Sequence, residues 1–203
     1  MIPDARANAP KHRGWWKGDQ GQVGAWVYGY ESLWLPQSLL HKNARKRLAQ
    51  ALFDSSRHQR VELHFNKGLA GAPPECVAAA RQCATNPAVC EAFALAIIAN
   101  GQGPVYPGYA DAKPDVEAAR KQAAQIDQAA STLRAIAPQA GSYVSESNYF
   151  NNDWEREFWG QNAKRLRSVK AKYDPSGLFF VHHGVGSELW STDGFERMDA
   201  GTK

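Results

Sequence analysis

The sequence lacks any hydrophobic run long enough to cross a membrane as a helix. Its longest uninterrupted apolar stretch, residues 92–99, is far shorter than the roughly 20 residues that such a helix needs. The first thirteen residues also lack the basic, apolar and small-residue pattern of a secretory signal. We therefore expect a soluble chain without membrane contact. Its localisation stays open, because a missing N-terminus would hide a signal.

Several motifs of common catalytic and binding sites are absent as well. There is no Gly-x-Ser-x-Gly elbow and no His-Glu-x-x-His pair, so neither a serine hydrolase nor a zinc protease is predicted. The glycine-rich pieces at 18–24 and 101–108 lack a phosphate-loop pattern followed by a helix. No Asn-x-Ser/Thr acceptor occurs, which disfavours a heavily glycosylated secreted protein.

Cysteine is scarce: Cys76, Cys83 and Cys90 follow one another at intervals of seven residues. On one helix, neighbouring thiols would lie about 10 Å apart, which is too far for a disulfide. The spacing also lacks the close ligand pairs of structural zinc. Since Pro87 interrupts the segment, a contact between the last two cysteines stays open. We expect buried free thiols and no metal site.

The composition is that of a globular protein. A chain of 203 residues with 43% hydrophobic and 22% charged residues can bury a core of its own. Basic residues concentrate at 42–47 and 164–172, and the formal net charge is +4. Both clusters fall on predicted amphipathic helices, so we interpret them as solvated faces and expect no nucleic-acid partner.

Residue patterns predict an alternation of strands and helices. Strands are expected at 22–33, with a bulge at Gly24 or Gly29, and at 60–66, 93–98 and 143–147, with a strand-like segment at 178–181. Helices are expected at 36–53, 74–83, 114–138, 153–159 and 162–172, and a loop at 101–107. This order alone leaves a parallel and an antiparallel sheet open.

The last third carries a series of landmarks in a specific order: Tyr143-Val144-Ser145-Glu146, Trp159-Gly160, Asn162, Arg165-Leu166, Lys172-Tyr173-Asp174-Pro175 and Leu178-Phe179. The series resembles the C-terminal segment of the berberine-bridge-enzyme-like, FAD-linked oxidases. Weaker similarity extends upstream to 29–36, 64–71 and 86–89. Most of the chain is therefore covered.

The resemblance implies the vanillyl-alcohol-oxidase fold: an FAD-binding domain, a substrate domain on an antiparallel sheet, and a segment that returns to the FAD domain. It selects an α+β class with an antiparallel sheet and covering helices. Residues 1–140 are then part of the substrate domain and residues 141–203 the flavin-contacting segment. The FAD-binding domain has no counterpart here, so the chain alone is expected to be incomplete, inactive and prone to self-association.

The same resemblance implies hydride transfer from an alcohol-type small molecule to FAD, with oxygen as the final acceptor. Glu146 takes the position of the catalytic Tyr or Glu, and Ser145 replaces the usual Asn. Tyr143 ranks second as a catalytic residue. His64 and Asn66, on the polar face of their strand, would line the substrate cavity if the FAD domain covers that face. Without the resemblance, Glu146 would be an exposed residue at a sheet edge.

The remaining candidates are expected to contact the cofactor. Asn162 would bond either the flavin or the adjoining loop, although a helix-capping role alone would also explain it. His182 and His183 are adjacent on an expected strand and would point to opposite faces. One of them would then face the pocket, the other would be structural, and the two could not easily bind the same metal ion.

Two alternatives to an oxidase remain. One is a non-catalytic α+β binding module that uses its basic helices, and the other is an inactive truncated product.

Overall fold

The computed structural model describes residues 2–4, 6–16, 24–66, 69, 72–105 and 113–198. Parts of the predicted strand at 22–33, of the glycine-rich pieces and of the 64–71 motif lie outside these residues. The described elements, with short 3-10 helices written η, are β1 (Ile2–Pro3), β2 (Gly14–Trp15), β3 (Ala25–Pro36), η2 (Gln37–Leu40), α1 (Arg45–Ser56), β4 (Glu62–Phe65), α2 (Pro74–Ala80), η3 (Pro87–Cys90), β5 (Ala92–Pro104), α3 (Val116–Arg134), α4 (Trp154–Trp159), η4 (Gly160–Asn162), α5 (Ala163–Tyr173) and η5 (Ser187–Leu189).

A three-stranded antiparallel sheet in the order β3-β5-β4 forms the framework. The expected α+β class with an antiparallel sheet is confirmed. The register of β3 against β5 shifts between Val27 and Gly29, one of the two places where a bulge is predicted. The loop expected at 101–107 is wrong over its first part, because β5 continues to Pro104 and pairs with Ala25. Pairing with a long neighbouring strand overrides the local preference of glycine for loops.

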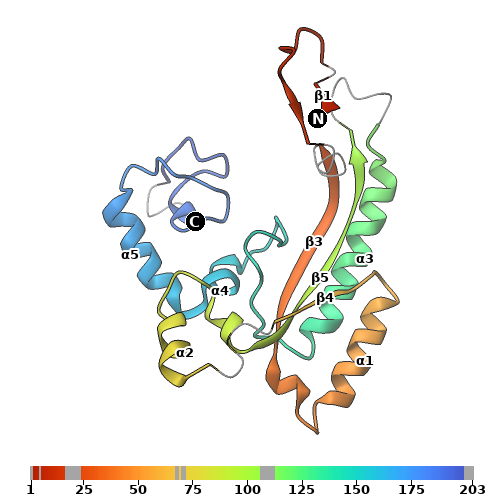
Figure 1. Cartoon of the computed structure of the whole chain (residues 1–203), viewed down its shortest axis with the longest axis vertical. Coiled ribbons are helices and arrows are strands. Elements are labelled where there is room, and N and C mark those ends of the chain that lie inside the picture. Colours follow the sequence, from red (N-terminus) through yellow and green to blue (C-terminus); the bar gives the residue numbers. More distant parts are fainter. Residues whose placement is uncertain are drawn as a thin grey trace.

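Helices α1 and α3 cover one face of this sheet (Figure 1). The core between them includes the fully buried side chains of Leu33, Leu35, Ile98, Ile126 and Leu133. Burial of each such side chain contributes about 1.5–3 kcal/mol. The long helix α3 begins as predicted, because the carboxylate of the residue before it accepts a hydrogen bond from a backbone N–H in the first turn.

The helix predicted at 36–53 is divided. Residues 37–40 form the 3-10 helix η2, the extended backbone of His41 ends it, and α1 begins only at Arg45. Leu40 is exposed because η2 does not continue the helical period of α1. Phe53 is exposed because it follows Leu48 by five residues on α1, which places it about 140° away around the helix. The basic residues at 45–47 are exposed, as predicted.

The cysteines are free, as predicted, but two of them are not buried. Cys76 lies on α2, which ends at Ala80, and Cys83 follows that end. Cys90 lies in η3 and is half-buried. The prediction of burial fails because the three residues do not share one helix with a single buried face.

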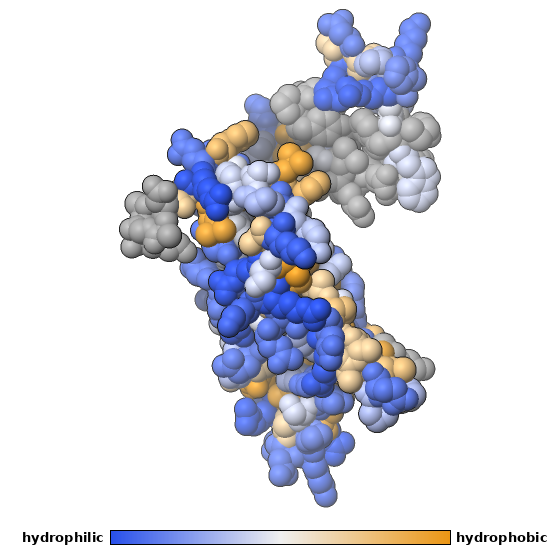
Figure 2. All heavy atoms as spheres, turned by 90° about the vertical axis from the view of Figure 1, so that its left-hand side faces the viewer, coloured by the Kyte–Doolittle hydropathy of each residue, from blue (hydrophilic) through white to orange (hydrophobic). Residues whose placement is uncertain are grey.

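The C-terminal residues form a loosely packed lobe of α4, α5 and η5 on the side of the sheet away from α1 and α3 (Figure 1). Gly160, with φ of 51°, ends α4 as the sequence predicts. Helix α5 buries none of its residues. On the face that this lobe presents, hydrophobic residues lie at the surface among hydrophilic ones (Figure 2). No helix in the described ranges is long and apolar enough to cross a membrane.

Two strands predicted in this lobe do not form. Residues 143–147 make a tight turn, in which the N–H of Glu146 donates to the carbonyl of Tyr143 at 3.0 Å. Residues 178–181 have no regular structure, and His183 has a φ of 57°. Short apolar runs form strands only where a partner strand is available. The segment at 143–147 bonds back on itself in a turn, and at 178–181 the side chains of Leu178, Phe179 and Val181 are exposed.

Candidate functional site

The sheet face away from α1 and α3 carries polar and aromatic side chains in cross-strand rows. Strand alternation places Tyr30, Ser32 and Trp34 of β3 on this face, since Leu33 and Leu35 point into the helical core. The register aligns Ser32 with Ile97 and Glu62, and Trp34 with Leu95 and His64. This face is where the C-terminal lobe meets the sheet.

The segment that leads into the turn at 143–146 is bonded directly to β3. The N–H of Trp34 donates to the carbonyl of Gly141 at 2.8 Å. The hydroxyl of Ser142 donates to the carbonyl of Ser32, and the N–H of Tyr143 donates to the Ser32 hydroxyl at 3.0 Å. The ring of Tyr143 packs edge-on against Trp34 at 6.1 Å between centroids. These bonds fix the turn above the sheet face.

Glu146 meets Tyr30 at this position. Both side chains are half-buried, and the phenol of Tyr30 lies close enough to the carboxylate of Glu146 to interact with it. Burial, followed by the interaction with this carboxylate, raises the pKa of Tyr30 to about 12. The phenol therefore keeps its proton at neutral pH.

A buried ionic cluster lies on the other side of β3. Arg134, in the last turn of α3, bonds Glu31 at 3.0 Å and Glu157 of α4 at 2.8 and 3.1 Å. Asn148 donates to Glu31 at 2.8 Å, and Asn151 donates to Glu157 at 2.9 Å. We call these five residues the Arg134 cluster.

The cluster connects the sheet, α3 and the C-terminal lobe. The side chains of Glu31 and Glu157 are only 9% and 7% exposed. Burial acts to lower the pKa of Arg134, but the two carboxylates outweigh it and raise that pKa above its usual range. Because Asn148 lies two residues after Glu146, the cluster also anchors the far end of the candidate catalytic turn.

A pocket of about 340 Å³ lies beside the same turn. The residues that line it are Val144, Ser145, Ser147, Asn148, Tyr149, Phe158, Val181, His182, His183 and Gly184. Part of its wall is a row of stacked rings. The His182 ring stacks on Tyr149 at 4.1 Å and on His183 at 3.9 Å, and His183 stacks on Trp154 at 5.3 Å.

The prediction that the two histidines point to opposite faces is wrong. They do not lie on a strand, and the left-handed backbone of His183 turns its ring onto that of His182. Burial, followed by the neighbouring His182, lowers the pKa of His183. Both rings line the pocket, so neither is confined to a purely structural position.

The other predicted site residues lie elsewhere. Asn162 donates to the backbone carbonyls of Arg81, Cys83 and Thr85 at 3.0–3.3 Å, and its side chain makes no helix-capping bond. Its observed partner is thus the adjoining loop. The alternative of a capping role is not observed, because the Oδ1 of Asn162 accepts no hydrogen bond from the first turn of α5.

The two predicted substrate residues differ from each other. The side chain of Asn66 donates to the carbonyls of Val89 and Ala92, which ties the end of β4 to η3 and β5. His64 is exposed on the sheet face and lies 2.8 Å from Glu62. His64 therefore remains open to a ligand, whereas the Asn66 amide is engaged by backbone.

Sequence reasoning missed Tyr30 and the Arg134 cluster. One signal for them was available: Glu31 is the one charged residue of the segment 25–36, which is otherwise mostly aromatic and apolar. A carboxylate at such a position requires a buried partner. The identity of that partner could not be read from the sequence, since Arg134 is more than a hundred residues away.

The described part of the chain contains no group of three or more His, Cys, Asp or Glu residues arranged to hold a metal ion. The two basic segments lie apart, near α1 and on α5 at opposite sides of the molecule, and they do not form one continuous surface (Figure 1).

Comparison with known proteins identifies the segment that carries the turn. Residues 125–186 match the family model "Berberine and berberine like". The VAO-type flavoprotein oxidase VAO615 of Thermothelomyces thermophilus is 40% identical over 92 residues, which cover 43% of this chain and 15% of that protein. The FAD-linked oxidoreductase cheF of Chaetomium globosum is 44% identical over 88 residues, 41% of this chain and 14% of that protein. The matched part is thus a small fraction of each relative.

Solved structures extend the similarity to most of the fold. The crystal structures of the VAO-type flavoproteins MtVAO615 and MtVAO713 from Myceliophthora thermophila C1 each cover 80% of this chain, with TM-scores of 0.57 and 0.60 and sequence identities of 24% and 20%. The chain corresponds to 28% and 27% of those two proteins. Residues 125–186 are therefore similar to the berberine-like family, relatives with matching segments are named FAD-linked oxidoreductases, and the chain has the fold of part of the VAO-type flavoproteins.

Proposed function

We propose that this chain forms the substrate-side wall and the C-terminal segment of an FAD-dependent oxidoreductase that oxidises an alcohol-type small molecule, with oxygen as the final acceptor. The observation that carries the proposal is the Glu146 carboxylate, which interacts with Tyr30 and stands on a turn whose neighbouring residues Ser145 and Ser147 line the 340 Å³ pocket. A half-buried carboxylate on the turn that borders a pocket is suited to act as a general base.

The residues of the site fit part of the cofactor. FAD, when bound, supplies the hydride acceptor for such an oxidation. The indole N–H of Trp34 is buried beside Tyr143 and has no hydrogen-bond partner among the described residues, so it is available to an acceptor on a bound group. The stacked histidines line the pocket with their ring edges, since neighbouring rings cover their faces, and they would meet a bound group edge-on. At about 340 Å³, the pocket is at the small end of the range for ligand sites, which suits part of a dinucleotide.

The chain's own groups then have distinct tasks. Glu146 takes the proton of the substrate hydroxyl on its carboxylate, and the protonated phenol of Tyr30 next to it orients that carboxylate. Tyr143 borders the same turn and His64 lines the substrate side of the sheet face. His182 and His183 would help to hold the cofactor ring at the pocket, and Asn162 holds the loop around α2 in place.

The partner we propose is an FAD-binding domain that covers the C-terminal lobe. Large apolar side chains of this lobe are exposed, and an isolated chain would be inactive and would tend to associate with itself through them. These residues are Tyr149, Phe150, Val169, Tyr173, Leu178, Phe179, Val181, Leu189, Phe195 and Met198.

The proposal is tested by flavin binding followed by reduction. The chain is titrated with FAD alone and again with the FAD-binding domain of the Thermothelomyces relative, and flavin fluorescence quenching is recorded. We expect saturable quenching only in the mixture. The mixture is then given a panel of sugars and aromatic alcohols under anaerobic conditions, and bleaching of the flavin absorbance is followed.

Glu146→Gln should slow flavin reduction by about 10²- to 10⁴-fold while quenching stays unchanged, because the loss is of a proton acceptor and not of a binding surface. Glu75→Gln, an exposed carboxylate on α2, is the matched control and should reduce flavin at the wild-type rate. Equal rates for both variants would remove Glu146 from the mechanism. No quenching in the mixture, together with a stable monomer, would reject the oxidoreductase.

A further inference from the structure

The two histidines beside the candidate catalytic turn form the middle of a stack of four rings. Tyr149 covers His182 and Trp154 covers His183, with ring centroids 4.1 and 5.3 Å apart. The two imidazole rings themselves lie 3.9 Å apart. We call these four residues the ring stack. Because Trp154 belongs to α4 and Tyr149 follows the turn at 143–146, the ring stack joins three segments of the lobe.

The histidines occupy the centre of a tight turn whose backbone is unfavourable for them. The N–H of Gly184 donates to the carbonyl of Val181 at 2.7 Å, so His182 and His183 are the two central residues of a four-residue turn. The φ of His183, 57°, lies in the left-handed region, which glycine and asparagine adopt far more readily. The stacking contacts therefore hold the turn in a conformation that its sequence does not favour.

Few other contacts hold this turn against the lobe. The residues at 178–184 have no regular structure, and the side chains of Leu178, Phe179 and Val181 are exposed. The Nε2 atom of His182 lies 3.2 Å from the carbonyl oxygen of Tyr149. Segments with few buried apolar contacts open at a low cost in free energy. The ring stack is thus a main contact that keeps this wall of the 340 Å³ pocket closed.

Protonation acts directly on the ring stack. A single positive imidazole can remain between aromatic rings, but two positive rings 3.9 Å apart repel each other in a site partly shielded from water. Burial, followed by the charge of His182, lowers the pKa of His183. The stacked form therefore disfavours the proton, and by linkage the proton favours the open form. The stack is fully stable above the ordinary imidazole pKa of about 6.5 and loses stability as the pH falls below it.

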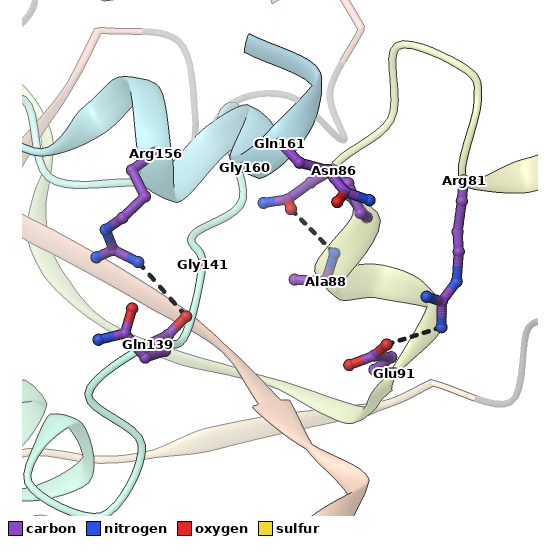
Figure 3. A pocket seen from close by; sticks show the side chains of 10 residues that line it. Arg81, Asn86, Ala88, Glu91, Gln139, Gly141, Arg156, Gly160 and Gln161 are labelled. Carbon is purple, nitrogen blue, oxygen red and sulfur yellow. Dashed lines mark hydrogen bonds and ion pairs between the residues drawn. The ribbon is translucent and has the colours of Figure 1, made fainter.

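The carboxylates of the elements packed against the histidines are engaged elsewhere and do not offset this repulsion. Helix α4 directs Arg156 toward the connection at 139–141, which passes between η3 and the end of α4, where Arg156 reaches the carbonyl of Gln139 (Figure 3). The interacting pairs are Asp153 with Arg156, Glu155 with Arg167, Glu157 with Arg134, and Glu146 with Tyr30. The remaining titratable group beside the histidines is the phenol of Tyr149.

We propose that the stacked histidines are a pH-sensitive latch on the pocket beside the candidate catalytic turn. At neutral pH the ring stack holds the turn at 181–184 against Tyr149 and Trp154. In an acidic medium both imidazole rings take up protons and repel each other, and the turn moves away from the lobe. A group held in the pocket is then released on acidification. The latch needs no bound flavin, so it does not depend on the proposed redox activity.

The test is hydrogen–deuterium exchange of the 203-residue chain at about pH 7.5 and about pH 5, on either side of the ordinary imidazole pKa. Exchange is read by mass spectrometry and corrected for the chemical effect of pH on amide exchange. The amides of residues 178–186 should exchange at least about tenfold faster at the lower pH, because two close charges repel strongly. The amides of β5 are the internal reference and should change by less than about twofold.

Two variants remove a titrating ring in different ways. His182→Phe keeps a flat ring between Tyr149 and His183, so the effect of pH should fall to about threefold or less. His183→Asn suits the left-handed backbone but does not titrate, so exchange should be the same at both pH values. His58→Phe, an exposed ring just after α1, is the matched control and should behave like the wild type.

The wild-type measurement alone can reject the latch. Equal corrected exchange of residues 178–186 at the two pH values would overturn it. An equal loss of protection in β5 would also overturn it, because the acid effect would then be unfolding of the whole sheet. Among the variants, an unchanged pH effect in His182→Phe, or the same reduction in His58→Phe, would show that the repulsion is not between the stacked rings.

Discussion

Replacement of Arg134 by methionine should destabilise the fold strongly. The variant leaves the carboxylates of Glu31 and Glu157 buried, at 9% and 7% exposure, without the guanidinium group that pairs with both. Removal of one partner from a buried ionic pair costs about 3–5 kcal/mol. Because the Arg134 side chain is itself 27% exposed, we expect the low end, about 3 kcal/mol. For a chain of this size, that corresponds to a loss of roughly 6–12 °C in Tm.

The measurement is urea unfolding followed by tryptophan fluorescence and circular dichroism. Arg120→Met, on the exposed side of the same helix, is the control and should stay within about 0.5 kcal/mol of wild type. A triple variant, Glu31→Gln, Arg134→Met and Glu157→Gln, removes all the charges together and should recover most of the loss. A cost below about 1 kcal/mol for Arg134→Met, or no recovery in the triple variant, would refute the view that this cluster anchors the lobe.

Three further predictions concern backbone space and titration. Gly141→Ala should cost about 1–3 kcal/mol in urea unfolding, because the new Cβ would approach backbone at 2.6 Å, whereas Gly103→Ala, with open space around it, should be nearly neutral. The folded state lowers the pKa of His183, so it disfavours the protonated ring. The contribution of His183 to the free energy of unfolding is therefore full above the ordinary pKa of about 6.5 and falls as the pH drops below that value. His183→Asn should flatten this pH dependence in unfolding measured from pH 8 to 5. The raised pKa of Tyr30 works in the opposite direction: its contribution is full below about pH 10 and is lost as the pH rises toward about 12, and Tyr30→Phe should remove the late phase of an ultraviolet phenolate titration.

Each of these has a result that would count against it. Equal costs for the two glycine variants would mean that the chain crossing at 141 is not tightly packed. If the free energy of unfolding depends on pH in the same way in His183→Asn as in the wild type, protonation of His183 does not affect stability. A late phenolate phase that persists in Tyr30→Phe would assign it to another tyrosine.

The sequence was sufficient to predict those elements whose stabilising contacts lie within their own residues. Helix α3 could be predicted because its apolar period and its capping Asp115 are both local. The end of α4 at Gly160 is of the same kind. The sheet's central strand was found but cut short, since only its partner β3 explains why glycines at 101 and 103 stay extended.

The candidate site depended on partners distant in sequence. Glu146 was proposed from family resemblance, and its position next to Tyr30 on a turn followed from no local pattern. The histidine pair was found as well, but its geometry was wrong, because an unusual backbone angle at His183 and not strand alternation sets the ring directions. Long-range bonds of this kind leave no periodic trace in a sequence.

The order of strands in the sheet has a consequence for how the chain folds during synthesis. Among the described strands, β3 pairs with β5 alone, and α1, β4 and α2 all lie between the two in sequence. The ribosome therefore releases β3 long before its partner exists, and Leu33 and Leu35 remain unpaired until residues 94–96, their partners in β5, have emerged. Contacts of such large sequence separation slow folding and leave a nascent chain open to association. We expect this protein to depend on a holding factor, such as a chaperone, over that stretch of translation.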